Sequence, residues 1–242
     1  MILQGQTPEP EKGPFSPFAW TIDALEPAAA PAIWVVDLDC LGDVPPATAD
    51  EQAAAAFYGD PLWARRFLAR RAAVRHLTGT LTGLAPEAVG LRRGTTGALT
   101  YEPALPGLNV SLSHRGPYAA MAFASTPIGV DLESVGDVVH IPWNVLHQDE
   151  AAMLETVPED QRPLAFLRLW TVKEAYVKAL GFGLSREPSS FCVVEDGGGV
   201  SVRDPLTADR PPVVATRIVS SLGPHDIVVS CVTFPDGVVL PS

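Results

Sequence analysis

Three acidic side chains have the type and spacing to bind a divalent cation. Asp131 and Glu133 flank Leu132, so in a β-strand both carboxylates point to the same side. Glu174 follows about 40 residues later. Neighbouring carboxylates repel each other unless a cation lies between them, and hard cations such as Mg²⁺ take oxygen ligands. We therefore predict a site for Mg²⁺, or for Mn²⁺, with Asp131, Glu133 and Glu174 as its ligands.

Glu174 lies in a stretch, 167–181, whose apolar residues recur at helical spacing. The stretch predicts a helix that ends at Gly181. Its apolar face would hold Leu169, Val172, Tyr176 and Leu180, and another face would hold Trp170, Lys173, Glu174 and Lys178. Taken alone, this pattern also fits an ordinary amphipathic helix whose charged face is solvated.

The two upstream acids follow the apolar run 119–124 and the turn residues 125–127. An apolar run, a Ser-Thr-Pro turn and a second apolar run predict a β-hairpin. Taken alone, the segment also fits an exposed hairpin end with two solvated acids.

Together these motifs resemble the signature of the Sfp-type 4′-phosphopantetheinyl transferases. The residues that carry the resemblance are Gly-Val-Asp-Leu-Glu at 129–133, Trp-Thr-Val-Lys-Glu-Ala at 170–175 with Lys178, Asn109 to Arg115 ending in Ser-His-Arg, and Gly-Phe-Gly-Leu at 181–184. The match extends over roughly residues 62–194. The resemblance implies an α+β fold of two pseudo-symmetric α/β halves, with the active site in the cleft between them.

We expect an irregular N-terminal segment at 1–30, an N-terminal half at 31–116 that binds coenzyme A phosphates, and a C-terminal half at 117–242. In the N-terminal half the sequence predicts a strand at 32–38, a helix at 50–58 and a long helix at 63–78 that Gly79 ends. This long helix resembles the stretch 167–181 when the sequence is shifted by 102 residues. That shift places Arg71 on Lys173 and Gly79 on Gly181.

The strongest basic cluster of the chain lies at 62–115, with eight arginines and two acids in a protein of net charge −11. Such a cluster suggests a compact polyanion as ligand. The resemblance implies that the coenzyme phosphates are held by arginines, of which we select Arg66, Arg71, Arg75, Arg92 and Arg93. Relatives place a Gly-Lys-Pro near 97–99, where this chain has Ala98, so Arg92, Arg93 or the helix arginines would replace that lysine.

The resemblance also assigns roles to residues of the other motifs. His114 would contact a coenzyme phosphate, with Ser113 helping to hold it, and Lys173 and Lys178 would hold phosphate charge. Glu174 would act as the base that deprotonates the acceptor, so the catalytic group comprises Glu174, Lys178, Asp131 and His114. Relatives often have an acid such as Glu150 near the metal.

The implied activity is Mg²⁺-dependent transfer of 4′-phosphopantetheine from coenzyme A to a serine of an apo acyl or peptidyl carrier protein, with release of 3′,5′-ADP. Such carriers serve fatty-acid, polyketide or nonribosomal peptide biosynthesis. Two alternatives stay open: a metal-dependent hydrolase of coenzyme A or a nucleotide, which would need no carrier, and a non-catalytic carrier-binding module, which would not bind coenzyme A.

Composition indicates the setting in which the protein works. The negative net charge argues against nonspecific nucleic-acid binding. No apolar run approaches the length of a membrane span, and the N-terminus lacks the layout of a signal peptide. Three scattered cysteines argue against a disulfide framework. We therefore expect a cytoplasmic protein without a membrane partner, and a monomer, since one chain holds both halves.

Overall fold

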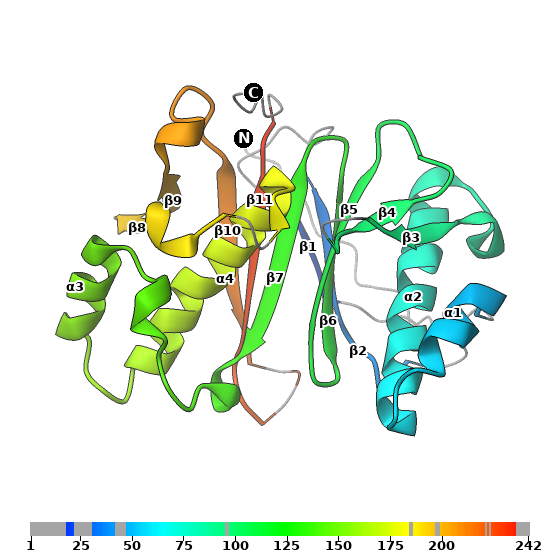
Figure 1. Ribbon diagram of the computed structural model, residues 1–242, viewed down its shortest axis with the longest axis horizontal. Helices are drawn as coiled ribbons and strands as arrows, with labels where there is room; N and C mark the ends of the chain where they lie inside the picture. The colour runs from blue at the N-terminus through cyan, green and yellow to red at the C-terminus, as the bar shows by residue number, and fades with distance from the viewer. Residues whose placement is uncertain are drawn as a thin grey trace, which may run out of the picture.

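The computed structural model describes residues 18–21, 31–41, 47–94, 97–183, 186–196, 199–220, 222 and 224–235. These residues form an α+β protein in which two antiparallel sheets lie in the centre, with the long helices on either flank (Figure 1). Among the described helices, none combines the length and apolar character that a bilayer crossing requires.

The first half is built on a four-stranded sheet with strand order β1-β2-β6-β5. These strands are β1 (Phe18–Thr21), β2 (Ala32–Asp37), β6 (Tyr118–Ala124) and β5 (Asn109–Arg115). This half also contains α1 (Ala49–Ala55), the long α2 (Pro61–Thr82), and the small hairpin of β3 (Leu91–Arg93) and β4 (Leu99–Tyr101).

The second half is built on a three-stranded sheet with strand order β10-β11-β7. These strands are β10 (Val213–Val219), β11 (Ile227–Thr233) and β7 (Ile128–Ser134). This half also contains α3 (Gln148–Thr156), the long α4 (Arg162–Leu180), and the hairpin of β8 (Cys192–Asp196) and β9 (Gly199–Arg203).

The two halves repeat one order of elements, namely a strand, a short helix, a long helix, a small hairpin and two more strands. β2 corresponds to β7, α1 to α3, α2 to α4, and β5 and β6 to β10 and β11. The sheet orders agree as well, because β2-β6-β5 matches β7-β11-β10. The prediction of an α+β fold with two pseudo-symmetric halves is therefore confirmed.

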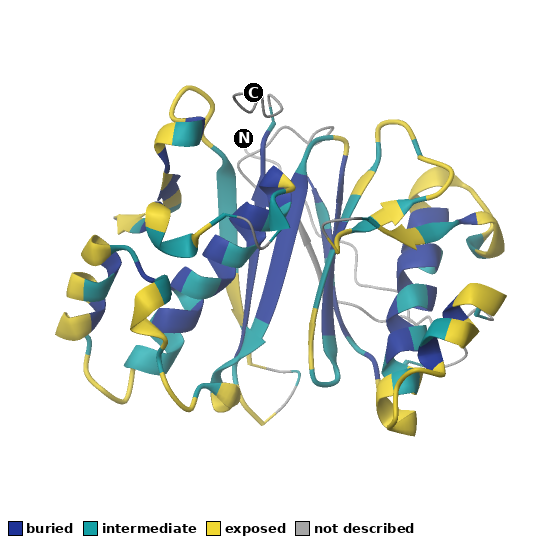
Figure 2. Cartoon of the chain, in the orientation of Figure 1, coloured by how far each residue is buried: buried dark blue, intermediate teal, exposed yellow. Residues whose placement is uncertain are grey.

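Alternation along the strands explains how four layers pack together. On β6, Met121 and Phe123 face α2, whereas Ala120 and Ala122 face the second sheet. On β11, Val228 joins the core under α4, whereas the alternate residues pack between the sheets. Each sheet is thus apolar on both faces, and Figure 2 shows β7 and β6 as buried strands in the middle of the molecule.

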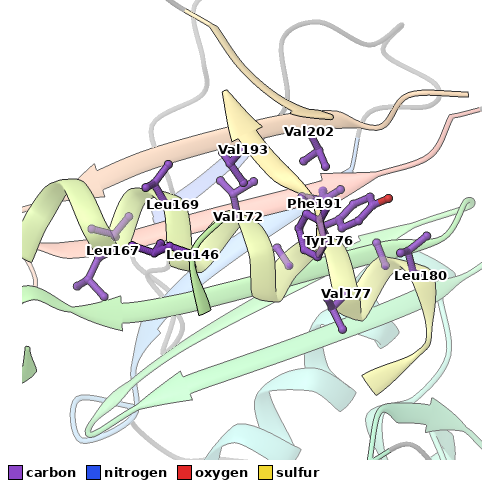
Figure 3. Packing of buried hydrophobic residues seen from close by; sticks show 14 of the residues in the cluster. Leu146, Leu167, Leu169, Val172, Tyr176, Val177, Leu180, Phe191, Val193 and Val202 are labelled. Carbon is purple, nitrogen blue, oxygen red and sulfur yellow. The ribbon is translucent and has the colours of Figure 1, made fainter. Parts of the chain in front are cut away.

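The predicted helix at 167–181 is confirmed as the C-terminal part of α4. Gly181 caps it in the left-handed conformation, with φ 77°. Its expected apolar face is buried (Leu169, Val172, Tyr176 and Leu180), and Figure 3 shows these side chains packed with Phe191 and Val193 of the following segment. Four strands, β8 to β11, follow this helix along the chain.

Three expectations about local structure are wrong. The run 119–124 does not form a hairpin with 128–134, because β6 pairs with β2 and β5 while β7 pairs with β11. The turn between them instead carries the chain from one sheet to the other. The long helix of the first half does not end at Gly79 but at Thr82, with Gly83 as its cap at φ 77°. The segment 1–30 contains the strand β1 and is not irregular throughout.

The division into domains stays a prediction. The expected boundary after residue 116 falls between β5 and β6, which pair with each other within the first sheet. The remainder of the 1–30 segment lies outside the described residues, as does Leu184 of the Gly-Phe-Gly-Leu motif.

Candidate functional site

A cavity of about 1040 Å³ lies between the two halves, where the sequence predicts the active site. Residues of α1, α2 and β5 line it from the first half, and α4 and the loop after it line it from the second. Its charged and hydroxyl side chains include Arg70, Arg71, Arg93, Ser111, Ser113, His114, Glu174, Lys178 and Arg186. The size and the mixed lining suit a nucleotide-sized ligand.

The site forms where an edge strand of one sheet meets an edge strand of the other. β5 and β7 are each the last strand of their sheet, and side chains rather than a backbone ladder join them. Ser111 Oγ accepts the Val130 N–H at 3.0 Å, and Ser113 Oγ donates to Asp131 Oδ1 at 2.7 Å. The Ser-His strand and the Asp-Leu-Glu strand of the predicted motif are therefore brought together.

Alternation along β7 turns the acids toward α4. Val130 and Leu132 pack into the core between the sheets, so Gly129 and Asp131 take the opposite face. A Cβ on Gly129 would lie 1.9 Å from the Ala175 carbonyl oxygen. Only glycine therefore allows α4 to approach β7 this closely.

Asp131 lies at the centre of this junction. Lys178 Nζ donates to Asp131 Oδ1 at 2.7 Å and to the Val130 carbonyl at 3.0 Å. Asp131 is 4% exposed, and its second oxygen, Oδ2, is buried without a hydrogen-bond partner among the described residues. Buried polar atoms in folded proteins nearly always have a partner, so this oxygen is available to a ligand.

Two more carboxylates share the electrostatic environment of Asp131. Burial, followed by the Asp131 charge, raises the pKa of Glu133 to about 7, although Arg115 at 3.4 Å opposes the shift. Burial, followed by the same charge, also raises the pKa of Glu174. Both acids are thus held where ionisation is unfavourable unless positive charge is added.

By their chemistry these three acids suit a hard divalent cation, although the group whose ligand atoms all lie within 4.8 Å of one another among the described residues is His147, Asp149 and Cys192. They supply oxygen ligands alone, as Mg²⁺ and Mn²⁺ prefer. One buried oxygen has no partner, and two neighbouring carboxylates resist ionisation in the absence of added positive charge. The predicted set of Asp131, Glu133 and Glu174 is consistent with this arrangement.

His114 extends from the end of β5 into a cluster of cations. Desolvation, followed by the charges of Arg70, Lys178, Arg93 and Arg115, lowers the pKa of His114 to about 4. The ring is therefore neutral at neutral pH in the free protein. An anion bound among these cations would raise the pKa of the ring toward its ordinary value.

Two of the arginines that the sequence selected line the cavity. Arg71 has a buried Nη1 without a hydrogen-bond partner among the described residues, and desolvation lowers its pKa. Arg93 crosses its hairpin, and its Nε donates to the Gly97 carbonyl at 3.2 Å. Since Ala98 also lines the cavity, the Arg93 guanidinium lies near the position where relatives have a lysine.

Two other selected arginines are engaged elsewhere. Arg66 forms a two-point ion pair with Asp39, at 2.5 and 3.0 Å. Arg92 is exposed and pairs with Glu102 at 3.1 Å. Neither residue is part of the cavity lining. Their assignment to the coenzyme phosphates stays a prediction, with both guanidinium groups engaged by carboxylates in this structure.

Arg75 and Lys173 are buried in ion pairs and also lie outside the cavity lining. Arg75, at 1% exposed, pairs with Glu51 of α1. Lys173, also at 1% exposed, pairs with Glu150 of α3 at 2.9 Å. Their assignment to coenzyme phosphate stays a prediction, and these buried ion pairs do not favour it. Glu150 is likewise occupied by Lys173 and does not belong to the Asp131 site.

Sequence reasoning missed two cations of the cavity. Arg70 is 7% exposed and donates to the Tyr58 hydroxyl at 3.2 Å. Arg70 follows Phe67 by three positions, so the two residues lie on the same face of α2, and this face lines the cavity. That spacing could have identified Arg70 from the sequence. Arg186 lies in a loop beyond the recognised motifs, and nothing in its sequence context marks it.

Several known proteins are similar to this chain in sequence. The profile described as the 4′-phosphopantetheinyl transferase superfamily matches residues 127–230. A 4′-phosphopantetheinyl transferase of Bacillus subtilis is 36% identical over 107 residues, which cover 43% of this chain and 48% of the relative. The 4′-phosphopantetheinyl transferase psf-1 of Bacillus pumilus is 28% identical over 169 residues, covering 69% of this chain and 72% of the relative.

A third relative, the 4′-phosphopantetheinyl transferase HetI of a Nostoc strain, is 33% identical over 145 residues that cover 57% of this chain and 61% of the relative. The chain thus spans about half the length of the first of these relatives and more of the other two. The matched residues include β7, α3, α4 and strands that follow them. Asp131, Glu133, Glu174 and Lys178 are among the matched residues. By these matches the chain is similar to the 4′-phosphopantetheinyl transferases.

Proposed function

We propose that this chain transfers the 4′-phosphopantetheine arm of coenzyme A to a serine hydroxyl of an apo acyl or peptidyl carrier protein. A bond forms between the serine oxygen and the phosphorus on the pantetheine side, the pyrophosphate P–O bond breaks, and 3′,5′-ADP leaves. The reaction depends on Mg²⁺, for which Mn²⁺ can substitute. The named relatives are 4′-phosphopantetheinyl transferases.

The observation that carries the proposal is the free Oδ2 of Asp131. This oxygen is buried beside Lys178 and near two acids that resist ionisation. A bound divalent cation there would neutralise charge that develops on the pyrophosphate oxygens. Asp131, Glu133 and Glu174 would hold it.

The remaining residues would orient the substrates and move one proton. Arg71, Arg93 and His114 line one wall of the cavity and would hold phosphate oxygens as hydrogen-bond donors. Lys178 neutralises Asp131 and also lines the cavity. The Glu174 carboxylate, which lines the cavity, would accept the proton of the acceptor hydroxyl.

A monomer suffices for this arrangement. Both walls of the cavity come from one chain, with arginines from the first half and the acids and Lys178 from the second. We propose that the protein acts as a cytoplasmic monomer on an acidic carrier. Its own net charge is −11, so such a carrier would dock beside the arginines rather than by attraction to the whole molecule.

Intact-mass spectrometry tests the proposal. Several purified apo carrier proteins would each be incubated with this protein, coenzyme A and Mg²⁺, beside an Asp131→Ala control. The expected result is a carrier that gains the mass of one phosphopantetheine arm only with the unaltered protein. Formation of 3′,5′-ADP without any carrier would instead indicate a hydrolase. Coenzyme A that neither binds nor reacts would indicate a non-catalytic module.

A further inference from the structure

Lys173 has no donor left for a phosphate. Its side chain is 0% exposed, and Nζ lies 2.9 Å from Glu150 Oε1, 2.8 Å from the Pro188 carbonyl and 2.7 Å from the Phe191 carbonyl. An ammonium group has three N–H donors, and three acceptors surround this one. Lys173 therefore fastens the segment 188–191 to α4.

Glu150 completes this fastening from α3. Its Oε1 also accepts the Val193 N–H at 2.6 Å, and its Oε2 accepts the His147 N–H at 2.8 Å. One buried ion pair thus joins the start of α3, the middle of α4 and the start of β8. The Phe191 ring lies under Lys173 Nζ, 4.4 Å from its centroid, and packs against Tyr176 at 4.8 Å (Figure 3).

The fastened segment leads directly to the cavity. Arg186 and Pro188 line the cavity wall on the side of α4. Arg186 Nη2 donates to Asp204 Oδ2 at 2.6 Å, and the same oxygen accepts the Tyr176 hydroxyl at 2.9 Å. The Arg186 guanidinium also lies 5.7 Å from the Phe191 ring centroid. Phe191, which Lys173 holds, therefore supports Arg186 as well.

Arg186 keeps unused hydrogen-bonding capacity. Guanidinium has five N–H donors, and Asp204 is the one hydrogen-bond acceptor found for Arg186 among the described residues. Its Nε is buried without a partner in that part of the chain. The side chain is 24% exposed and recessed in the cavity wall, which suits a small anion better than the surface of an acidic protein.

We propose that Arg186 binds a phosphate group of the anionic ligand, and that Lys173 is a positioning residue that acts through Arg186. Lys173 and Glu150 hold the segment 188–193, and this segment fixes the guanidinium against the cavity. The inference rests on the proposed function for the identity of the ligand, which is coenzyme A. It does not depend on the transfer step.

A double-mutant cycle tests the proposal through the dissociation constant of coenzyme A, measured by calorimetry without a carrier protein. Arg186→Gln should weaken binding by about tenfold, the usual effect of one charge-assisted hydrogen bond. Lys173→Met should weaken binding to a similar extent, and the double variant should be no weaker than the poorer single variant. Arg168→Gln, which removes an α4 cation paired with Glu195 outside the cavity, should bind normally.

Glu150→Gln covers the case in which Lys173→Met does not fold. This variant breaks the same ion pair by changing its acidic partner, which cannot itself bind phosphate. It should therefore reproduce the loss of coenzyme A affinity. In steady-state assays both variants should raise KM for coenzyme A and leave kcat within about twofold.

Two results would overturn the inference. Unchanged affinity in Arg186→Gln would show that the guanidinium does not contact the ligand, even if KM for the carrier rises. Losses that multiply in the Lys173→Met/Arg186→Gln variant would show that Lys173 does not act through Arg186. If the four coenzyme A affinities show the expected pattern although no carrier protein is modified, that result would support the inference and contradict the proposed transfer.

Discussion

Lys178 Nζ contacts only one oxygen of Asp131, at 2.7 Å, and leaves the other buried oxygen without a partner among the described residues. The lysine thus compensates the carboxylate charge without occupying all of its lone pairs. Ser113, on the strand from the other half, donates to the same oxygen that Lys178 contacts. Contacts from both halves of the chain therefore hold the same oxygen, Oδ1, of Asp131.

Asp131→Asn should abolish metal-dependent activity while the fold is kept. The amide has nearly the same shape but no charge to attract a divalent cation. We expect the transfer rate to fall by at least about a hundredfold and the stabilisation of the protein by Mg²⁺ to disappear. Rate measurements and thermal unfolding with and without Mg²⁺ check both effects. Asp137→Asn, at an exposed acid paired with Arg115, is the matched control and should keep activity. Equal Mg²⁺ stabilisation in Asp131→Asn would place the cation elsewhere.

Without divalent cations, the protein should lose stability as the pH rises from about 4.5 through about 7. The folded protein holds the Glu133 proton more tightly than the unfolded chain, because burial and Asp131 raise its pKa to about 7. The contribution of this group is therefore fully present below the unfolded pKa of 4.5 and is lost as the pH passes the folded pKa. Thermal unfolding in EDTA at several pH values measures the trend.

Added Mg²⁺ should reverse this trend, because the cation favours the ionised acids. Its stabilising effect should therefore increase over the same pH interval. Glu133→Gln should flatten the pH dependence measured in EDTA. A Mg²⁺ effect that is constant from pH 5 to pH 8 would argue against Glu133 as a ligand.

Coenzyme A binding near pH 5.5 should take up protons at His114. The free protein keeps the ring neutral there, since desolvation and four cations lower its pKa to about 4. Bound phosphates offset those cations, so the pKa rises and the ring is protonated in the complex. Calorimetry in buffers of different ionisation enthalpy measures the uptake. His114→Asn should remove it, and uptake that survives this change would have to come from another group.

Arg71→Met should stabilise the free protein but weaken coenzyme A binding. The Arg71 guanidinium is desolvated, and one of its nitrogens lacks a partner within the described residues. Its charge therefore costs stability until an anion arrives. We expect about tenfold weaker binding and a higher unfolding temperature.

Arg66→Met is the contrasting variant for this prediction. Its guanidinium pairs with Asp39 outside the cavity, so coenzyme A affinity should stay unchanged. Stability should fall by at most about 1 kcal/mol, as for other ion pairs near the surface. Thermal unfolding and calorimetry on both variants make the comparison. A larger loss of coenzyme A affinity in Arg66→Met than in Arg71→Met would contradict the assignment of Arg71 to the cavity wall.

The sequence predicted the site best where local pattern and spatial position coincide. α4 and β7 each carry a clear period, so the faces of Glu174, Lys178 and Asp131 followed from their spacing. The edge-to-edge contact of β5 with β7 did not follow, because consecutive strands usually pair in one sheet. Here the turn at 125–127 joins two different sheets instead.

The two long helices do correspond to each other, but not at the offset of 102 residues that the sequence suggests. The sequence predicts a helix stop at Gly79, but a Cβ there would lie 2.6 Å from the Leu84 carbonyl oxygen. It is a glycine because of this close approach, and Gly83 provides the cap. Gly83 corresponds to Gly181, and the buried Arg75 to Lys173, so the long helices match at an offset of 98 residues rather than 102.

The sequence also did not predict that Arg75 and Lys173 are buried. Each cation pairs with a glutamate in the capping box of the preceding short helix, Glu51 in α1 and Glu150 in α3. Both partners lie more than 20 positions away, so no helical spacing reveals the pairs. A long basic side chain on a helix is usually solvated, and only the folded structure shows these two to be structural.

Anomalous diffraction from crystals grown with coenzyme A and Mn²⁺ would test the central claim most directly. We predict one manganese peak bounded by the carboxylates of Asp131, Glu133 and Glu174, in contact with the pyrophosphate oxygens, and its loss in Asp131→Asn crystals. Coenzyme A bound in the cavity without a manganese peak at these acids, or with the peak at other residues, would contradict it.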